Sequence, residues 1–336
     1  FPWVKGLIAK ALVAYDYTNT EWKTWRRDLT EYTYDYANEE YVGKEINTAY
    51  LESKFENYEK PTYQFSLNYN NTFAKRHNIG ATFVWEMYND KKNWVTGTRD
   101  FAIGLIPDLD YGNDSNQKSS GKTQKTAHAG WVGRLNYDYG NRYLVEFNFR
   151  YDGTYKFQRG NRWGFFPGVS LGWRVSEEDF FKKLLPDMDN LKIRASYAKV
   201  GDEGDFDAFQ YLDGYTSHGS YIMGSGGVTS GMTTVGMANS WLTWYESKIM
   251  NVGFEVSYHR GLISMEFDWF RRNRSGLPAT RSGSLPTVFG ESMPQENLNS
   301  DINTGFEIAI GHKNKIGEFL YDISANFSTT RIKYDY

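Results

Sequence analysis

The chain has 336 residues, of which 40% are apolar, and a formal net charge of −3 at pH 7. It contains no run of 18 or more apolar residues, which excludes a transmembrane helix, and no basic field that would point to nucleic acid. Because it has no cysteine, disulfides, cysteine-ligated zinc and thiol catalysis are excluded as well.

Aromatic residues make up 18% of the chain, with 26 Tyr, 22 Phe and 11 Trp. Membrane β-barrels gather such residues in two girdles at the membrane boundaries. An aromatic-rich soluble β-sandwich or propeller explains the composition equally well. The mean hydropathy of −0.65 does not decide between them, since a barrel strand presents only every second residue to lipid.

The first third of the chain predicts three strands separated by long polar loops. We expect a strand at 6–17 and then a Tyr-rich loop at 18–61, with room for a small hairpin or helix. Residues 62–73 and 77–89 alternate between apolar and polar types around a short turn, which predicts a hairpin. A second long loop follows at 90–127, and we expect its low-complexity end to be mobile.

The clearest pattern runs from Ala129 to Val175, where three segments alternate strictly between apolar or aromatic and polar residues. Only Gly140-Asn141 separates the first two segments, whereas a basic loop at 153–162 separates the second and third. Successive side chains of a strand point to opposite faces, so each segment predicts a strand with one apolar and one polar side.

Residues 176–190 break this pattern and predict a short helix that ends near Pro186. We expect Ser176 to be its N-cap and Asp179 the capping-box partner. The apolar residues that share one face of this helix are Phe180, Leu184 and Leu185.

The remaining third predicts further strands and loops. The strands are expected at 191–200, 244–258, 261–271, 302–312 and 317–331. The loops between them lie at 201–243 and 272–301, and tight turns at His259-Arg260 and 313–316.

The lengths of the connections alternate between long and short without a break. The long connections are 18–61, 90–127, 153–162, 201–243 and 272–301, and the short ones are 74–76, 140–141, 176–189, which is helical, 259–260 and 313–316. Bacterial outer-membrane barrels have short periplasmic turns and long extracellular loops. A soluble sandwich has no physical reason to sort its loops in this way, because both of its ends face the same solvent. The fold class is therefore predicted to be all-β, a transmembrane antiparallel β-barrel.

Several longer motifs point to one family. They are YDG at 151–153, the Arg162-Trp163 pair, FFPGVSLGWR at 165–174, LKIRASYAKVG at 191–201, YESKIMNVGFEVSY at 245–258 and NTGFEIAIGHKNK at 303–315. With these motifs the chain resembles the SusC/RagA-like TonB-dependent transporters of Bacteroidota. The resemblance is most specific over residues 134–204 and covers nearly the whole chain.

The resemblance implies a barrel of roughly 22 strands, of which we count about 11 here. A plug domain and a TonB-contacting segment would lie upstream of Phe1, and the last strands beyond Tyr336. An open half barrel cannot bury its edge strands in lipid, so we expect residues 1–336 to be part of one larger barrel domain. The resemblance also implies two partners, a SusD-like surface lipoprotein as a lid and TonB on the periplasmic side.

Polar side chains of the central strands are expected to line the barrel lumen. The candidates are Arg134, Arg150, Asp152, Arg174 and Arg194, together with Asn136, Glu146 and Asn148. One interpretation is a polar wall that contacts plug or substrate. The other is a structural ladder of opposed charges between neighbouring strands and the plug.

Aromatic residues in the long loops are candidates for stacking on sugar rings or packing on a partner. The substrate-binding candidates are Tyr111, Trp163, Tyr215 and Tyr221, with Trp94, Trp241 and Trp244 as further loop aromatics. Trp163, Trp241 and Trp244 border strands, so membrane girdles are the alternative for these three.

We expect neither a metal site nor catalysis. The acidic string that begins at Asp108 lacks the ordered spacing and terminal Glu of a calcium loop, so a solvated loop is the preferred interpretation. There is no HExxH, GxSxG or P-loop motif, and no cofactor is predicted.

The sequence thus predicts a non-enzymatic outer-membrane protein that imports a large nutrient, an oligosaccharide or a peptide, and that contacts lipid and lipopolysaccharide but no nucleic acid. Two alternatives remain open. One is a passive porin or structural barrel without a plug. The other is a secreted aromatic-rich binding module or glycosidase, against which the sorting of the loops argues.

Overall fold

The computed structural model describes residues 4–102, 106–224, 227–281 and 293–335, and also residues 283, 286, 288, 290 and 291. The chain divides into two compact units, which are described separately below. The first unit contains Phe1–Ala11, Gln64–Glu86 and His128–Tyr336, and the second contains Leu12–Tyr63 and Met87–Ala127. None of the helices in these described stretches is long and apolar enough to cross a lipid bilayer.

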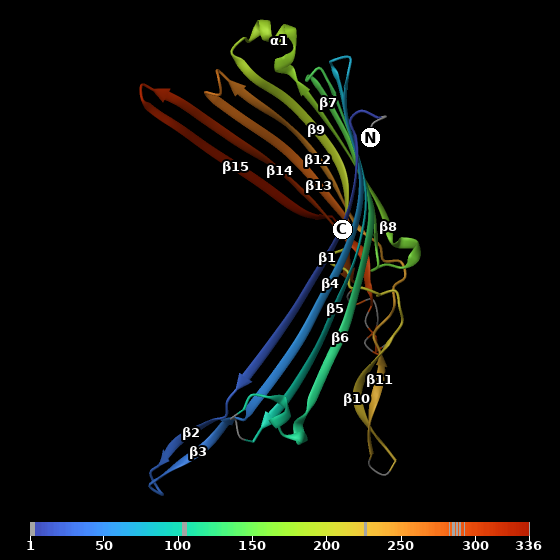
Figure 1. Cartoon of the computed structure of the whole chain (residues 1–336), viewed down its shortest axis with the longest axis vertical. Coiled ribbons are helices and arrows are strands. Elements are labelled where there is room, and N and C mark those ends of the chain that lie inside the picture. Colours follow the sequence, from blue (N-terminus) through green and yellow to red (C-terminus); the bar gives the residue numbers. More distant parts are fainter. Residues whose placement is uncertain are drawn as a thin grey trace. The chain divides into compact units, whose positions relative to one another are not determined.

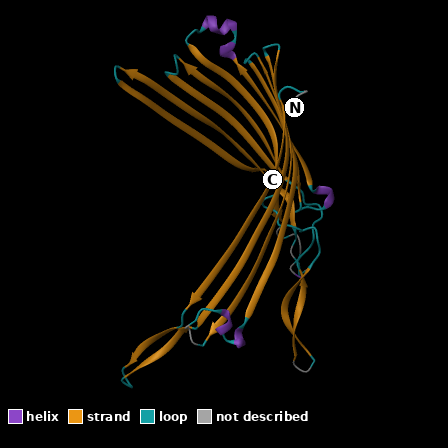
Figure 2. Cartoon of the chain, viewed as in Figure 1, coloured by secondary structure: helices purple, strands orange, loops and turns teal. Residues whose placement is uncertain are grey.

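The structure is built on one 11-stranded sheet, which confirms the all-β prediction and the number of strands (Figures 1 and 2). In spatial order its strands are β1 (Leu7–Arg26), β4 (Ala49–Phe73), β5 (His77–Phe101), β6 (Lys118–Tyr139), β7 (Tyr143–Thr154), β8 (Trp163–Arg174), β9 (Met188–Asp202), β12 (Tyr245–Tyr258), β13 (Ile263–Thr280), β14 (Gln295–Ile316) and β15 (Phe319–Asp335). The ladders described from β6 to β9 and from β9 through β12 to β15 are antiparallel.

In the second unit, the predicted loops are much shorter than expected. Loop 18–61 holds the end of β1, a hairpin of β2 (Leu29–Asp35) and β3 (Glu40–Asn47), and the first part of β4. Of the predicted loop 90–127, only the segment between β5 and β6 lies outside the sheet, and it contains the 3-10 turns η1 (Leu109–Tyr111) and η2 (Asp114–Asn116). About half of the region expected to be mobile belongs to strand β6. Alternation missed these strand ends because most of their residues are polar or charged, and three of their apolar residues, Ala49, Leu51 and Phe101, form a small buried cluster that no continuous apolar face marks in the sequence.

The same correction applies in the first unit. Loop 201–243 contains a hairpin of β10 (Tyr215–Met223) and β11 (Gly227–Thr234), and loop 272–301 is shortened at both ends by β13 and β14. The last turn lies at Gly317-Glu318 and not at 313–316, because the β14–β15 ladder continues through Ile316 and Phe319. The polar run Lys313-Asn314-Lys315 is part of that ladder.

Tight turns join the strands at one end of the first unit, where the predicted turns at 74–76, Gly140-Asn141 and His259-Arg260 are confirmed (Figure 1). Each has two or three consecutive residues with positive φ: Ala74 and Lys75, Gly140 and Asn141, and His259 to Gly261. This backbone matches the right-handed twist of the flanking strands. Hydrogen bonds also link neighbouring turns, such as the one from the Gly140 N–H to the Arg76 carbonyl, at 2.7 Å.

The connection between β8 and β9 contains the short helix α1 (Asp179–Leu184), but its details differ from the prediction. Its N-cap is Glu178, and Ser176 lies buried inside the preceding 3-10 turn η4 (Val175–Glu177). The buried residue of α1 is Phe181, and the three residues expected to share one face are exposed. These three are Phe180, Leu184 and Leu185.

Glu178 anchors α1 to the strands, which explains the altered start of the helix. Its carboxylate accepts hydrogen bonds from Trp173 Nε1 and Arg142 Nη1, each at 3.2 Å. A second Arg142 nitrogen bonds Asp179 at 3.1 Å. The Tyr143 hydroxyl, then the Trp173 indole and Arg142, hold the pKa of Glu178 below its ordinary value, against the opposing effect of burial.

This lowered pKa predicts a pH-dependent contribution to stability. A carboxyl whose pKa falls on folding stabilises the fold fully above its unfolded pKa, about 4.3, and loses that contribution as the pH drops through the lowered value. We expect Glu178→Gln to lower the thermal unfolding midpoint of the protein in detergent at pH 7, and the difference from the parent protein to shrink below about pH 4. Glu177→Gln is the control, because Glu177 forms an exposed ion pair with Lys182, at 2.6 Å. A difference that stays the same at acid pH would contradict the assignment.

Candidate functional site

One face of the first unit's sheet is apolar and carries aromatic residues at two levels, and it is called the apolar face below. Toward the long loops, Tyr151 stacks on Trp163 with ring centroids 4.9 Å apart, and Phe83 stacks on Trp131 at 5.5 Å. At the end with the tight turns, Tyr139 stacks on Tyr143 at 6.4 Å. The band between the two levels consists of exposed apolar side chains, among them Leu135, Val145, Phe147, Val169 and Leu171.

The spacing of the two aromatic levels fits a membrane. Trp163 and Trp173 lie at the two ends of β8, ten residues apart. Ten residues of strand span about 34 Å, and a tilt of about 40° reduces this to a height of about 26 Å. Outer-membrane barrels have an apolar band about 25 Å tall between their girdles. The exposed band is therefore the lipid-facing surface of membrane-spanning strands.

The opposite, polar face carries the predicted lumen residues, and most of them form ion pairs. Arg134 pairs with Glu146 at 2.7 Å, from a neighbouring strand. Arg150 pairs with Asp152 at 2.7 Å and with Glu86 at 2.9 Å. The Arg150–Asp152 pair lies within one strand, whereas the Arg134–Glu146 and Arg150–Glu86 pairs join different strands, as a charge ladder requires. Which of the two interpretations holds stays a prediction. Arg174 differs, because its Nε is buried and has no hydrogen-bond partner in the described part of the chain.

Arg194 is the centre of the largest charge cluster on the polar face. It forms ion pairs with Glu255 and Glu266, each at 2.5 Å, and with Asp268. Arg194 and Asp268 lie two strands apart, and both are opposite Gly253 on the intervening strand β12. The guanidinium crosses over this glycine, where a Cβ would stand 2.3 Å from Asp268 Oδ1 and 2.5 Å from the Phe267 carbonyl oxygen.

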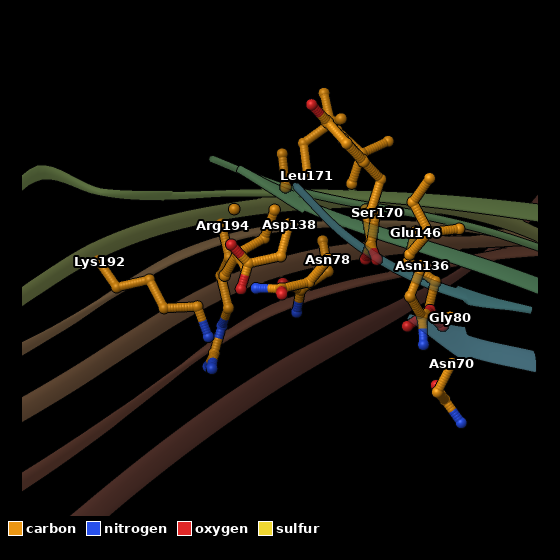
Figure 3. A pocket seen from close by; sticks show the side chains of 18 of the residues that line it. Asn70, Asn78, Gly80, Asn136, Asp138, Glu146, Ser170, Leu171, Lys192 and Arg194 are labelled. Atoms are coloured by element: carbon orange, nitrogen blue, oxygen red, sulfur yellow. The ribbon is translucent and has the colours of Figure 1, made fainter. Parts of the chain in front are cut away.

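A cavity of about 1190 Å³ lies on the polar face, toward the end with the tight turns. Its wall is rich in amides and charges, including Asn70, Asn78, Asn136, Asn251, Lys192, Arg194, Asp138, Glu146, Asp268 and Glu307. Figure 3 shows the polar ends of Asn70, Asn78, Asn136, Lys192 and Arg194 pointing to the same side of the sheet. The side-chain amide oxygen of Asn136 is buried and has no partner among the described residues. The wall thus offers many hydrogen-bonding groups to a large polar occupant.

The predicted aromatic candidates belong to different elements of the two units. Tyr215 and Tyr221 are exposed on the β10–β11 hairpin of the first unit, and Tyr111 is exposed in η1 of the second. Trp163 lies on the apolar face with its ring over Gly153, a placement that fits the girdle alternative. Their role in binding stays a prediction.

Two groups of residues near the long loops were missed by the sequence patterns. Phe157, Phe206, Leu242 and Tyr245 form a buried cluster, against which Trp244 packs. Asn161 and Asn297 hold the loops together, since Asn161 donates to the Ser240 carbonyl at 3.1 Å and Asn297 to the Thr243 carbonyl at 2.8 Å. Such contacts link loops far apart in sequence, so no local motif marks them.

No group of three or more His, Asp or Glu side chains in the described ranges is arranged to hold a metal ion. In the acidic string, Asp114 instead accepts a hydrogen bond from Gln117 at 2.9 Å and lies 3.7 Å from Arg99.

Gly253 provides a direct test of the Arg194 cluster. We expect Gly253→Ala to cost about 1–3 kcal/mol of unfolding free energy, because the new methyl group collides with the backbone of the next strand as well as with Asp268. Gly172→Ala is the matched control, since Gly172 lies opposite Arg194 on β8, but there the three atoms nearest to the added Cβ belong to side chains, two of Leu144 at 3.2 and 3.3 Å and one of Lys192 at 3.6 Å. Equal losses for the two variants, measured by denaturant unfolding in detergent, would contradict this account.

Comparison with curated proteins gives relatives of one kind. The chain is 28% identical over 334 residues to TonB-dependent receptor P39 of Formosa agariphila, a match that covers 96% of this chain and 30% of the relative. It is 33% identical over 200 residues to TonB-dependent receptor SusC of Bacteroides thetaiotaomicron, which covers 59% of this chain and 20% of the relative. The chain therefore spans less than a third of the length of these relatives.

Comparison with solved structures gives the same fold. The RagAB peptide importer in its open-open state matches with a TM-score of 0.83 at 17% identity, over 98% of this chain and 34% of the other. The ferripyoverdine receptor of the outer membrane of Pseudomonas aeruginosa matches with a TM-score of 0.50 at 12% identity, over 98% of this chain and 39% of the other. The family described as "TonB dependent receptor-like, beta-barrel" matches residues 7–336. With its two aromatic levels, its polar face and its alternation of tight turns and long loops, this chain belongs to the TonB-dependent receptor β-barrel family of the outer membrane.

Proposed function

We propose that the chain is part of the barrel wall of a TonB-dependent importer that moves a large nutrient across the outer membrane. The nutrient is an oligosaccharide or a peptide, and a SusD-like surface lipoprotein serves as the lid. The family match and the SusC and RagAB relatives support this proposal. The relatives are receptors, not enzymes, and the proposed work is binding and passage without covalent chemistry.

The polar face is the observation that carries the proposal. A barrel that only filled its interior with apolar packing would not place paired charges and amides around a cavity of about 1190 Å³. Arginine–carboxylate pairs hold charged side chains in place on such a wall, and the Asn136 amide oxygen, which has no partner among the described residues, can accept a hydrogen bond from a plug or a passing solute. We assign Arg134, Arg150, Asp152, Arg174 and Arg194 to this lumen wall.

The edges of the sheet support a larger assembly on the same polypeptide. β1 and β15 each have a neighbour on only one side within the described sheet. An unpaired strand edge cannot remain in hydrocarbon, because each free N–H and C=O there costs several kcal/mol. On this ground we propose that residues 1–336 are part of one barrel domain whose remaining strands pair with these edges, with the plug domain elsewhere on the polypeptide.

Specificity in this proposal lies in the long loops. Tyr111, Tyr215 and Tyr221 are exposed, and each can stack on a sugar ring or pack on a peptide side chain. Trp163 is the weaker substrate candidate because it lies with the lipid-facing aromatics.

A native purification tests the proposal. We expect the full-length protein, extracted from outer membranes with detergent, to bring down a surface lipoprotein in comparable amount and to yield plug peptides from its own polypeptide in mass spectrometry. Uptake of the nutrient should stop when TonB is deleted. Recovery of a barrel alone, without plug peptides and with uptake independent of TonB, would favour the passive porin and contradict active import.

A further inference from the structure

The helix α1 lies beside the lipid-facing surface of the first unit. It connects β8 to β9 at the end where the tight turns gather (Figure 1). Its N-cap, Glu178, contacts Trp173 at 3.2 Å and also bonds Tyr143. Both aromatic residues belong to the apolar face, on the aromatic level near the tight turns. The helix is thus attached to the outside of the sheet, at the boundary of the apolar band.

The free side of α1 is apolar. Phe180 is 61% exposed and Leu184 is 72% exposed, whereas Phe181 is only 9% exposed. Phe180 and Leu184 are four residues apart, so they lie one above the other on the same side of the helix. Phe181 holds the helix against the protein while this pair points away from it. Two large apolar side chains exposed together in this way mark a contact surface.

Charged residues flank this apolar side: Asp179, which pairs with Arg142, lies in the first turn, and lysines lie in the last. Lys182 and Lys183 occupy the last turn of α1. Lys182 pairs with Glu177 at 2.6 Å, and Lys183 makes no ion pair with any described residue. Apolar side chains next to lysines on a short surface helix are the composition of segments that lie in the membrane interface. Lysine can bury its methylene stem near acyl chains while its ammonium group reaches a phosphate.

We propose that α1 is an interfacial anchor that lies on the periplasmic phospholipid leaflet of the outer membrane. Phe180 and Leu184 insert among the upper acyl segments, and Lys183 contacts lipid phosphate. Tyr143 and Trp173, of the aromatic level on the apolar face, both bond Glu178, so the helix begins at the edge of the lipid-facing surface. The inference rests on the membrane placement of the strands and is independent of what the barrel imports.

Fluorescence quenching in bilayers tests this anchor. The full-length protein carries bimane at Leu184→Cys and is reconstituted in vesicles of phosphatidylethanolamine and phosphatidylglycerol. We expect lipid with a nitroxide near its headgroup to reduce the emission by about twofold or more, and aqueous iodide to have little effect, as for a group at the acyl boundary. Leu171→Cys, in the lipid-facing band, is the membrane control, and Asn38→Cys, at the exposed β2–β3 turn, is the water control.

Either of two results would overturn the proposal. Iodide quenching equal to that of Asn38→Cys would place α1 in water. Protection from both quenchers would place it against protein, either another segment of the polypeptide or a periplasmic partner. Phe180→Cys provides a second site if Leu184→Cys does not fold, with heat-modifiable migration on gels as the check of folding.

Discussion

Backbone hydrogen bonding is the constraint on which this structure depends. A chain in hydrocarbon has no water to satisfy its N–H and C=O groups, so each strand has to pair with its neighbours over the full thickness of the membrane. The β12–β13 ladder runs without interruption from Glu246 and Ser275 to Tyr258 and Ile263. Where the described ladders β9–β12 and β13–β14 shift register, they do so at strand ends, at Ser257/Tyr258 and from Ser275 to Pro278. In these two ladders, irregular backbone is thus confined to strand ends, where water is available.

Continuous strand pairing makes successive side chains alternate between the two sides of the sheet, and this alternation produces the apolar face and the polar face. One face presents an apolar band to lipid, and the Tyr151–Trp163 and Tyr139–Tyr143 ring stacks lie at the two edges of this band. The other face gathers charges that neutralise one another across strands, with Arg194 surrounded by carboxylates. Gly253 shows how closely the second face depends on the strand pairing. Because this residue has no side chain, the Arg194 guanidinium can cross β12 and reach Asp268. Breaking such a pair leaves a partly buried charge uncompensated, which is costly.

The sequence predicted the membrane-spanning core well because lipid imposes alternation there. β7 and β8, the sheet of 11 strands and most of the tight turns follow from apolar and polar positions alone. Outside the membrane lipid imposes no alternation, so β10 and β11 were interpreted as part of a loop. The hairpin of β2 and β3 was expected only as one of two possibilities, a small hairpin or a helix within 18–61.

Contacts between distant segments were beyond reach for a different reason. Pairing Arg194 with Asp268 requires the register of β9 against β12, and a long loop with its own hairpin separates these strands. The start of α1 depends on Tyr143 and Trp173, which lie on other elements, and so Ser176 looked like the better cap. The hydrogen bonds by which Asn161 and Asn297 hold the long loops together have no local sequence signature for the same reason.

A nitroxide scan along β7 tests the central claim most directly. Single labels placed in turn from Tyr143 to Tyr151 in the full-length protein in bilayers report their accessibility to oxygen, which concentrates in lipid, and to a water-soluble nickel complex. The account predicts a strict period of two, with oxygen favoured at Val145, Phe147 and Phe149 and not at the polar positions between them. Uniform accessibility to the nickel complex along the strand, or a period near 3.6, would contradict a membrane-spanning wall.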